Sequence, residues 1–262
     1  MKIRQIANTL TEKYSWNKFR FGAQPGTKNW RWRYLISCIL VGGNNEADTL
    51  RCDEELFEKF PTPEALAKAK FRTLADLIES YGLEYAGKKA AFIVGAAKRV
   101  IELGDVPDNR EGLEDIPGVG RHVASVILAT CYGQQEFAVD IHVRRIAKRL
   151  KLVSDSATDL QIEKEIRSLV PAKQWGHFSR SFVDFGQTIC GYAPKCGSCF
   201  FKKDCTHASE KALGRSAFKL KKSDGAYRVR THTIQVNNGY AKCDCMAGKF
   251  GRNCKHLKEL AA

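Results

Sequence analysis

The sequence contains no long apolar stretch. No run approaches the roughly 18 apolar residues that a membrane span needs, and residues 1–16 lack the apolar core of a secretion signal. Acidic residues are scarce too, with 29 Asp and Glu against 43 Lys and Arg and a formal charge of +14. We therefore expect an intracellular protein of the cytoplasm, nucleoid or nucleus that has no membrane partner and binds a polyanion such as nucleic acid.

Disorder is not expected, because 44% of the 262 residues are hydrophobic and the chain is long enough to bury a core. Apolar residues recur at helical spacing through the first 190 residues, for example at Ala90, Ile93 and Ala97. Loops are expected at 42–45 and 60–63, where Gly, Asn and Pro gather. We predict a mainly α fold and a monomer.

The C-terminal fifth differs in composition. Residues 206–262 carry 12 Lys and Arg but only 4 Asp and Glu, which suits a part of the protein that faces nucleic acid. After a polar linker at 206–226, short β-like runs precede a turn at 237–239. The predicted domains are thus a helical body at 1–205, the linker, and a small second domain at 227–262.

Residues 113–133 carry the strongest motif. A short helix ends in a tight turn and a second helix follows; the turn and the first residue after it are Pro117, Gly118, Val119, Gly120 and Arg121. The two glycines leave backbone N–H groups unpaired at a helix N-terminus, where a phosphate can bind. Such a hairpin grips the DNA backbone without reading its sequence. The alternative is an ordinary connection between packed helices.

Asp140 follows this hairpin, ahead of a helix whose apolar stripe begins at Val143. An Asp at such a place is an N-cap by default. Beside a phosphate-binding hairpin, its carboxylate could also face the sugar of a bound nucleotide.

The hairpin, the AVDIHVRR segment that contains Asp140 and a later cysteine cluster occur in an order typical of one family. Over about residues 30–205 the chain resembles the helix-hairpin-helix (HhH-GPD) DNA glycosylases of the endonuclease III and adenine or mismatch glycosylase type. The resemblance implies a two-lobed helical fold and base excision repair of double-stranded DNA with a damaged or mismatched base. It also implies that Asp140 is catalytic, stabilising the oxocarbenium-like sugar or activating the attacking water.

His122 stands where bifunctional members of that family carry a lysine, whose amine forms a Schiff base before the strand is cut. Imidazole cannot form a Schiff base, so we predict a monofunctional glycosylase that leaves an abasic site. His122 would line the base pocket or touch a phosphate; the alternative is a solvated residue of the first helical turn. A lyase that uses Lys88 or Lys89 is a competing hypothesis.

Seven of the ten cysteines fall in two tight groups, which in a reducing compartment favours metal ligation over disulfides. One compact run of four thiolates suits a [4Fe–4S] cluster better than zinc, which is the alternative. Related glycosylases carry such a cluster, with one more residue in the first interval than here. The four residues of this run are Cys190, Cys196, Cys199 and Cys205. The cysteines expected in the core instead are Cys38, Cys52 and Cys131.

The second group lies near the C-terminus and consists of Cys243, Cys245, Cys254 and His256. Three thiolates and an imidazole in close pairs can form a tetrahedral Zn²⁺ site, which a segment this short needs in order to fold. The segment resembles the SWIM type of zinc finger, and we predict a ββα-like domain. The resemblance implies binding to DNA or to a protein partner; the alternative is a stabilising cap.

The family resemblance suggests further DNA contacts. Lys202 and Lys203, on the cluster loop at 190–205, would face phosphates. A glycosylase also fills the gap left by the extruded nucleotide with wedge residues. Leu83 matches one wedge of the family, and Asn44 or Asn45 could replace the other; plain helix connections are the alternative.

The target base is predicted from two further features. Residues 182–186 resemble the adenine and mismatch branches more than endonuclease III, and the domain with which adenine glycosylases read oxidised guanine has no counterpart. Uracil or thymine opposite guanine is therefore the favoured target, with alkylated or deaminated purines as the alternative. A non-catalytic DNA-binding module is a hypothesis of another class.

Overall fold

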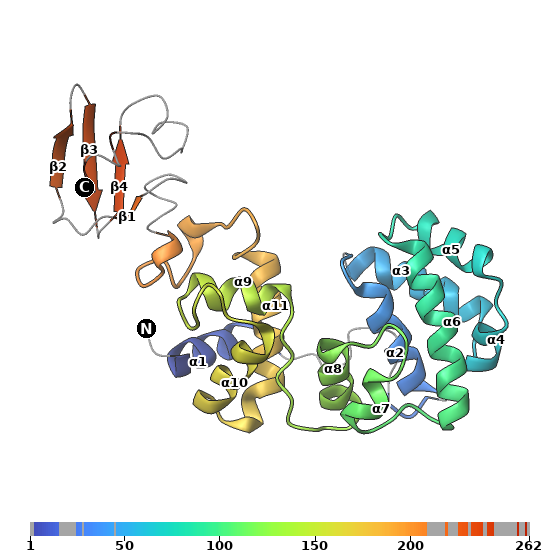
Figure 1. Ribbon diagram of the computed structural model, residues 1–262. Helices are drawn as coiled ribbons and strands as arrows, with labels where there is room; N and C mark the ends of the chain where they lie inside the picture. Colours follow the sequence, from blue (N-terminus) through green and yellow to red (C-terminus); the bar gives the residue numbers. More distant parts are fainter. Residues whose placement is uncertain are drawn as a thin grey trace. The chain divides into compact units, whose positions relative to one another are not determined.

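The computed structural model describes residues 3–15, 25–27, 29–44, 46–208, 218–219, 225–229, 232–237, 240–243, 256 and 260. The chain divides into two compact units (Figure 1). The larger unit is formed from residues 2–141 and 158–184, and the smaller unit from residues 142–157 and 185–262.

The larger unit is helical, as the apolar periodicity predicts. Its helices are α1 (Ile3–Lys13), α2 (Trp30–Val41), α3 (Glu46–Lys59), α4 (Pro63–Ala67), α5 (Phe71–Ser80), α6 (Ala86–Leu103), α7 (Arg110–Glu114), α8 (Arg121–Cys131), α10 (Asp159–Leu169) and the 3₁₀ turn η1 (Ala172–Gln174). Helix α11 (Trp175–Thr188) begins in the larger unit and ends in the smaller one. No helix among the described residues is both long enough and apolar enough to cross a membrane.

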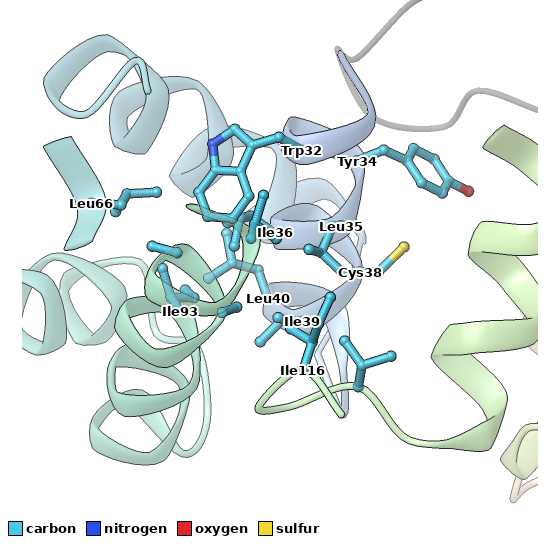
Figure 2. Packing of buried hydrophobic residues seen from close by; sticks show 14 of the residues in the cluster. Trp32, Tyr34, Leu35, Ile36, Cys38, Ile39, Leu40, Leu66, Ile93 and Ile116 are labelled. Atoms are coloured by element: carbon cyan, nitrogen blue, oxygen red, sulfur yellow. The ribbon is translucent and has the colours of Figure 1, made fainter. Parts of the chain in front are cut away.

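The core of the larger unit surrounds α2. All seven consecutive side chains of this helix from Tyr34 to Leu40 are buried. Figure 2 shows Leu35, Ile36, Ile39 and Leu40 of this helix packed with Ile93 of α6 and with Leu66 and Ile116. Burial of this apolar surface supplies most of the driving force for folding.

The three cysteines predicted to be core residues are buried in this cluster, which confirms the prediction. Burial raises the pKa of the Cys52 thiol and of the Cys131 thiol to about 12. Both are therefore neutral apolar side chains at physiological pH.

Helix ends follow the expected turn chemistry. Thr62 caps α4 by accepting a hydrogen bond from the Ala65 N–H, and Pro63 stands at the first helical position. A capping box between Thr158 and Gln161 starts α10. Gly104, with φ of 83°, ends α6 in the left-handed conformation that glycine favours.

The smaller unit contains α9 (Ile141–Arg149) from its second residue onward, the 3₁₀ turn η2 (Cys196–Ser198) and an antiparallel sheet. The strands are β1 (Phe218–Lys219), β2 (Gly225–Val229), β3 (His232–Asn237) and β4 (Tyr240–Cys243), in the order β1-β4-β3-β2. Ile234 pairs with Cys243 and Tyr227, so β3 lies between its two neighbours. The segment at 206–226, predicted as a linker, contributes β1 and the first residues of β2.

Candidate functional site

The predicted hairpin is present between α7 and α8. Asn109 caps α7 by accepting a hydrogen bond from the Gly112 N–H at 2.8 Å. The side chains of Leu113, Ile116 and Val119 are buried and anchor the turn in the core. The backbone of the hairpin is thus fixed by apolar side chains that point inward, which leaves its outer surface to peptide groups.

The glycines of the turn have distinct roles. Gly118 has φ of 85°, and a Cβ there would lie 2.9 Å from the Cβ of Phe92 on α6, so no other residue fits without a shift. Gly120 precedes α8 with no side-chain capping bond, and no atom lies within 4 Å of where its Cβ would be. The N-terminus of α8 is therefore approachable by a ligand, as phosphate binding requires.

Arg121, predicted to contact DNA, is engaged with another helix of the larger unit. Its guanidinium donates to both carboxylate oxygens of Glu163 on α10, at 2.8 and 3.1 Å. Arg167 donates to the same carboxylate at 2.9 Å. Burial raises the pKa of Glu163, but the hydrogen bonds from the two arginines outweigh burial and lower it overall. The pair ties the hairpin to α10.

His122 and Asp140 belong to one electrostatic site. The His122 side chain has an exposed surface, and desolvation by the surrounding protein lowers the pKa of its imidazole. The carboxylates of Asp140 and Asp159 oppose the shift, since each favours the charged imidazolium. Both carboxylates therefore lie within electrostatic reach of His122, and Asp159 was not among the predicted site residues.

Asp140 is half-buried at the start of α9. The three residues before it, Phe137, Ala138 and Val139, are buried, and the Ala138 carbonyl accepts a hydrogen bond from the Ser179 hydroxyl of α11 at 2.7 Å. Burial of these side chains and the hydrogen bond from Ser179 therefore both fix the segment that leads to the Asp140 carboxylate.

The two predicted wedge loops are joined by Asn44. Its side-chain oxygen accepts a hydrogen bond from the Glu84 N–H at 2.7 Å, and its amide nitrogen donates to the Leu40 and Gly42 carbonyls. The Asn44 side chain is thus already occupied within the protein. Asn45 lies outside the described residues.

Lys89 supports the same loop. Its ammonium donates to the Leu40 carbonyl and, at 2.8 Å, to the Gly42 carbonyl at the C-terminus of α2. Burial lowers the pKa of Lys89 from 10.5 to about 8. Lys89 thus satisfies carbonyl groups at the C-terminus of α2, where a positive charge is favourable. The sequence around Lys89 does not predict this contact.

The exposed side chain of the second loop is not the predicted one. Leu83 is 4% exposed and packs in the core, whereas Tyr85 is 68% exposed. Tyr85 has φ of 60° and ψ of 33°, a left-handed conformation that is rare for a bulky residue. Its ring lies beside Gly43, where a Cβ would be 4.0 Å from the tyrosine Cε2.

The four clustered cysteines lie around η2 and the segments that flank it. Cys205 is buried and the other three are half-buried. Burial raises the pKa of the Cys199 thiol and the other three cysteines raise it further, so all three lie within electrostatic reach of Cys199. Phe185, Phe200 and Phe201 pack against one another behind this loop, with ring centroids 4.6 to 5.6 Å apart.

The predicted [4Fe–4S] cluster does not require its four thiolates to converge on a single ion. In the part of the chain that the structure describes, no three His, Cys, Asp or Glu side chains converge closely enough to hold one metal ion. A cube of iron and sulfide keeps its thiolate ligands farther apart than a zinc ion does.

Two unpaired donors also point to a group between the cysteines. Arg145 Nη1 and Thr206 Oγ1 are buried and have no hydrogen-bond partner among the described residues. Arg145 contacts the Cys190 carbonyl through Nε at 3.0 Å, and Thr206 follows Cys205. Buried donors without partners are costly unless an acceptor is bound, and sulfur atoms of a cluster are such acceptors.

At the C-terminus the structure brings two of the predicted zinc ligands together. Cys243 and His256 are buried, with the cysteine Sγ 3.6 Å from the histidine Nδ1. The His232 ring packs on His256 with centroids 4.3 Å apart. Cys245 and Cys254 lie outside the described residues. The ββα arrangement predicted here differs from the four-stranded sheet that is observed.

Comparison with known proteins agrees with the geometry. Residues 36–172 match the family model described as HhH-GPD superfamily base excision DNA repair protein. The chain is 37% identical to endonuclease III of Thermotoga maritima over 185 residues, 70% of this chain and 85% of that protein. It is 32% identical to endonuclease III of Bacillus subtilis, over 63% of this chain and 76% of the relative.

Solved structures show the same fold. A trapped endonuclease III–DNA covalent intermediate superposes with a TM-score of 0.71 at 26% identity, covering 80% of this chain and 97% of that one. A thermostable thymine-DNA glycosylase gives a TM-score of 0.66 at 22% identity, covering 79% and 96%. The predicted mainly α, HhH-GPD-type fold is thereby confirmed.

Proposed function

The chain belongs to the HhH-GPD superfamily of base excision DNA repair proteins and is a DNA N-glycosylase, and we propose that it is a monofunctional one. It hydrolyses the N-glycosidic bond of an extruded base and leaves the strand intact. The observation that carries this proposal is an imidazole at position 122, where lyases of the family need an amine, within electrostatic reach of the Asp140 carboxylate.

The chemistry assigned to this pair follows from its charges. As the base departs, positive charge develops on the sugar, and the Asp140 carboxylate stabilises it or takes a proton from the attacking water. Desolvation around His122 strengthens such interactions because the local dielectric constant falls. His122 contacts the base or the adjacent phosphate and has no nucleophilic role.

The competing function is a bifunctional glycosylase and lyase. Its support is that similar proteins are named endonuclease III and that one solved structure similar to this chain is a trapped endonuclease III–DNA covalent intermediate. The alternative nucleophiles of this chain are poorly placed for such a step. The Lys89 ammonium donates to two carbonyls at the end of α2, and that of Lys88 lies 5.4 Å from the centre of the Phe92 ring.

For the target base we propose uracil or thymine opposite guanine, with alkylated or deaminated purines as the alternative. The support is the sequence of residues 182–186, in which Phe182 and Phe185 are buried on α11. A damaged or mispaired base also costs less to unstack than a matched one, which favours excision of such bases.

The DNA contacts proposed are the backbone at Pro117, Gly118, Val119 and Gly120 for one phosphate and Lys202 and Lys203, both exposed, for others. Since each phosphate contact releases counterions, binding should weaken steeply with salt. Tyr85, rather than Leu83, is the wedge that we propose for the gap in the duplex, because its ring is exposed and can stack on bases.

A [4Fe–4S] cluster on Cys190, Cys196, Cys199 and Cys205 is the proposed cofactor, and it would order the loop that carries the two lysines. A Zn²⁺ ion on Cys243, Cys245, Cys254 and His256 is proposed for the tail. Zn–S and Zn–N bonds of about 2.3 and 2.0 Å separate the two ligand atoms of a tetrahedral site by about 3.5 Å. The separation of Cys243 Sγ and His256 Nδ1, 3.6 Å, is close to this value. The tail would bind DNA or a protein partner.

The test uses oligonucleotides with single U·G, T·G, alkylated-purine and deaminated-purine sites. Free base is measured directly, and strand breaks are measured before and after alkali. The wild type should release a base but break the strand only after alkali, and Asp140→Asn should release none while keeping its DNA affinity. Efficient cleavage of abasic DNA, together with a borohydride-trapped adduct, would establish the lyase instead.

A further inference from the structure

Two arginines of α9 contact the first segment of the cysteine cluster. Arg149 Nη1 donates to the Gly191 carbonyl at 2.6 Å and to the Cys190 carbonyl at 3.3 Å, and it lies 3.4 Å from Cys190 Sγ. Its Nη2 donates to the Tyr192 carbonyl at 3.3 Å. One guanidinium therefore spans three consecutive carbonyls and one ligand sulfur. The planar fork of arginine is suited to such a set of acceptors.

Arg149 also reaches the far end of the cluster segment through its main chain. Its carbonyl oxygen lies 3.8 Å from Cys205 Sγ. The same residue thus contacts the first and the last of the four cysteines, although 41 and 56 residues separate it from them in the chain.

Arg145 lies one turn earlier on α9 and completes the contact. Its Nε donates to the Cys190 carbonyl at 3.0 Å, and its Nη2 donates to the Gly186 carbonyl at 3.3 Å. Its guanidinium lies 4.8 Å from the centre of the Tyr192 ring. Its Nη1 is the buried donor that has no partner among the residues described.

The loop that these arginines contact is short. Five residues separate Cys190 from Cys196. A loop of this length that must bring both of its ends to one bulky cluster can use only a narrow range of backbone conformations. The Lys195 N–H donates to the Ile189 carbonyl at 2.9 Å and closes the loop, while Arg149 occupies the carbonyls of its first half.

We propose that Arg149, assisted by Arg145, holds the loop between Cys190 and Cys196 in the conformation that places Cys190 for ligation, and that its N–H···S contact stabilises the bound thiolate. Arg149 is then a positioning residue for the cluster. The inference rests on the proposed [4Fe–4S] cofactor. It goes beyond it because it assigns assembly and retention of the cluster to a side chain outside the ligand set.

The charge of Arg149 has a second effect. A positive group and a hydrogen bond beside a ligand thiolate stabilise the reduced state of a cluster, because that state carries one more negative charge than the oxidised state. Removal of the guanidinium should therefore shift the midpoint potential of the cluster to more negative values. A purely structural role in packing α9 would not produce this shift.

The experiment compares Arg149→Met with Lys148→Met, a change on the same helix at a side chain that makes no hydrogen bond to residues 186–192. Iron and acid-labile sulfide per chain are measured after anaerobic purification, and cluster loss to a chelator is followed by visible absorption. Arg149→Met should lose its cluster about 10- to 100-fold faster than wild type, with a more negative potential. Lys148→Met should match wild type in both.

Arg149→Lys is the second variant, since it keeps the charge but cannot span three carbonyls with one ammonium. Its loss rate should lie between those of the wild type and Arg149→Met. Equal loss rates and equal potentials for all variants would overturn the inference while leaving the cluster in place. A wild type that contains no iron after anaerobic purification would instead refute the cofactor itself, and the inference with it.

Discussion

The ion pair between Arg121 and Glu163 offers a quantitative test of how the hairpin is held. The Glu163 side chain is 5% exposed and accepts hydrogen bonds from Arg121 and Arg167, so Glu163→Gln leaves two guanidinium groups without their shared carboxylate. Arg121 is 43% exposed, and solvent will stabilise it in part once its partner is neutral.

The magnitude follows from burial. Loss of one partner of a fully buried pair costs about 3–5 kcal/mol, and exposure of the arginine reduces this to about 2–4 kcal/mol. For a chain of this size each kcal/mol lowers Tm by about 2–4 °C, so a fall of about 4–16 °C is expected. The matched control is Asp115→Asn, whose pair with Arg99 is exposed on both sides and should cost less than about 1 kcal/mol.

Urea and thermal unfolding of the two variants measure this difference. The pH dependence gives a second reading, because the pKa of Glu163 is lowered in the folded protein. The ionised Glu163 therefore stabilises the folded protein above its unfolded pKa of 4.5, and this stabilisation is lost as the pH falls through the lower folded pKa. The free energy of unfolding of Glu163→Gln should not show this pH dependence. The reasoning is refuted if Glu163→Gln destabilises the protein no more than Asp115→Asn.

The remaining predictions concern catalysis, stability and base extrusion. His122→Lys should give a borohydride-trapped DNA adduct that the wild type lacks, because the desolvation that lowers the pKa of His122 would also favour a neutral amine; a folded variant that releases base but forms no adduct would contradict this. Burial raises the pKa of Asp53 from 3.8 to about 7, so wild-type stability should fall as the pH rises between these values. Asp53→Asn, which keeps the hydrogen bond to Ser37, should remove that slope and add at most about 4 kcal/mol at pH 8 in denaturant titrations; an unchanged slope would assign it to other groups. Tyr85→Ala should lower kcat/KM about 5- to 100-fold through lost stacking worth about 1–3 kcal/mol, with Tyr85→Phe near wild type; equal activity of all three proteins would exclude this wedge.

The sequence predicts those parts of the fold that depend on neighbouring residues. The hairpin turn follows from two glycines around Val119. The segment at 60–63 was predicted as a loop, and its last residue, Pro63, is the first residue of α4. Helical spacing does not single out the buried residues of α2, because all seven from Tyr34 to Leu40 are buried. The spacing rule also fails for Ile101, which continues the α6 stripe of Ala90, Ile93 and Ala97 but is 42% exposed.

Contacts between distant residues are not predictable in this way. The Arg121–Glu163 pair spans 42 residues and the Lys89–Leu40 hydrogen bond spans 49. A motif match places Leu83 at the wedge position, but its burial depends on packing against residues that are distant in the chain. The strand at 218–219 was not expected, because two residues carry no periodic signal and gain strand geometry only by pairing with β4.

The rigid turn at Gly118, which admits no side chain and takes its shape from Phe92 behind it, separates two tasks within a few residues. In the proposed DNA contact, the phosphate is bound by main-chain N–H groups of the turn, which do not depend on the side chain. Under the proposed function, position 122 can exchange imidazole for amine without disturbing this anchorage. Hydrolysis and strand scission would then differ by one side chain on an unchanged scaffold.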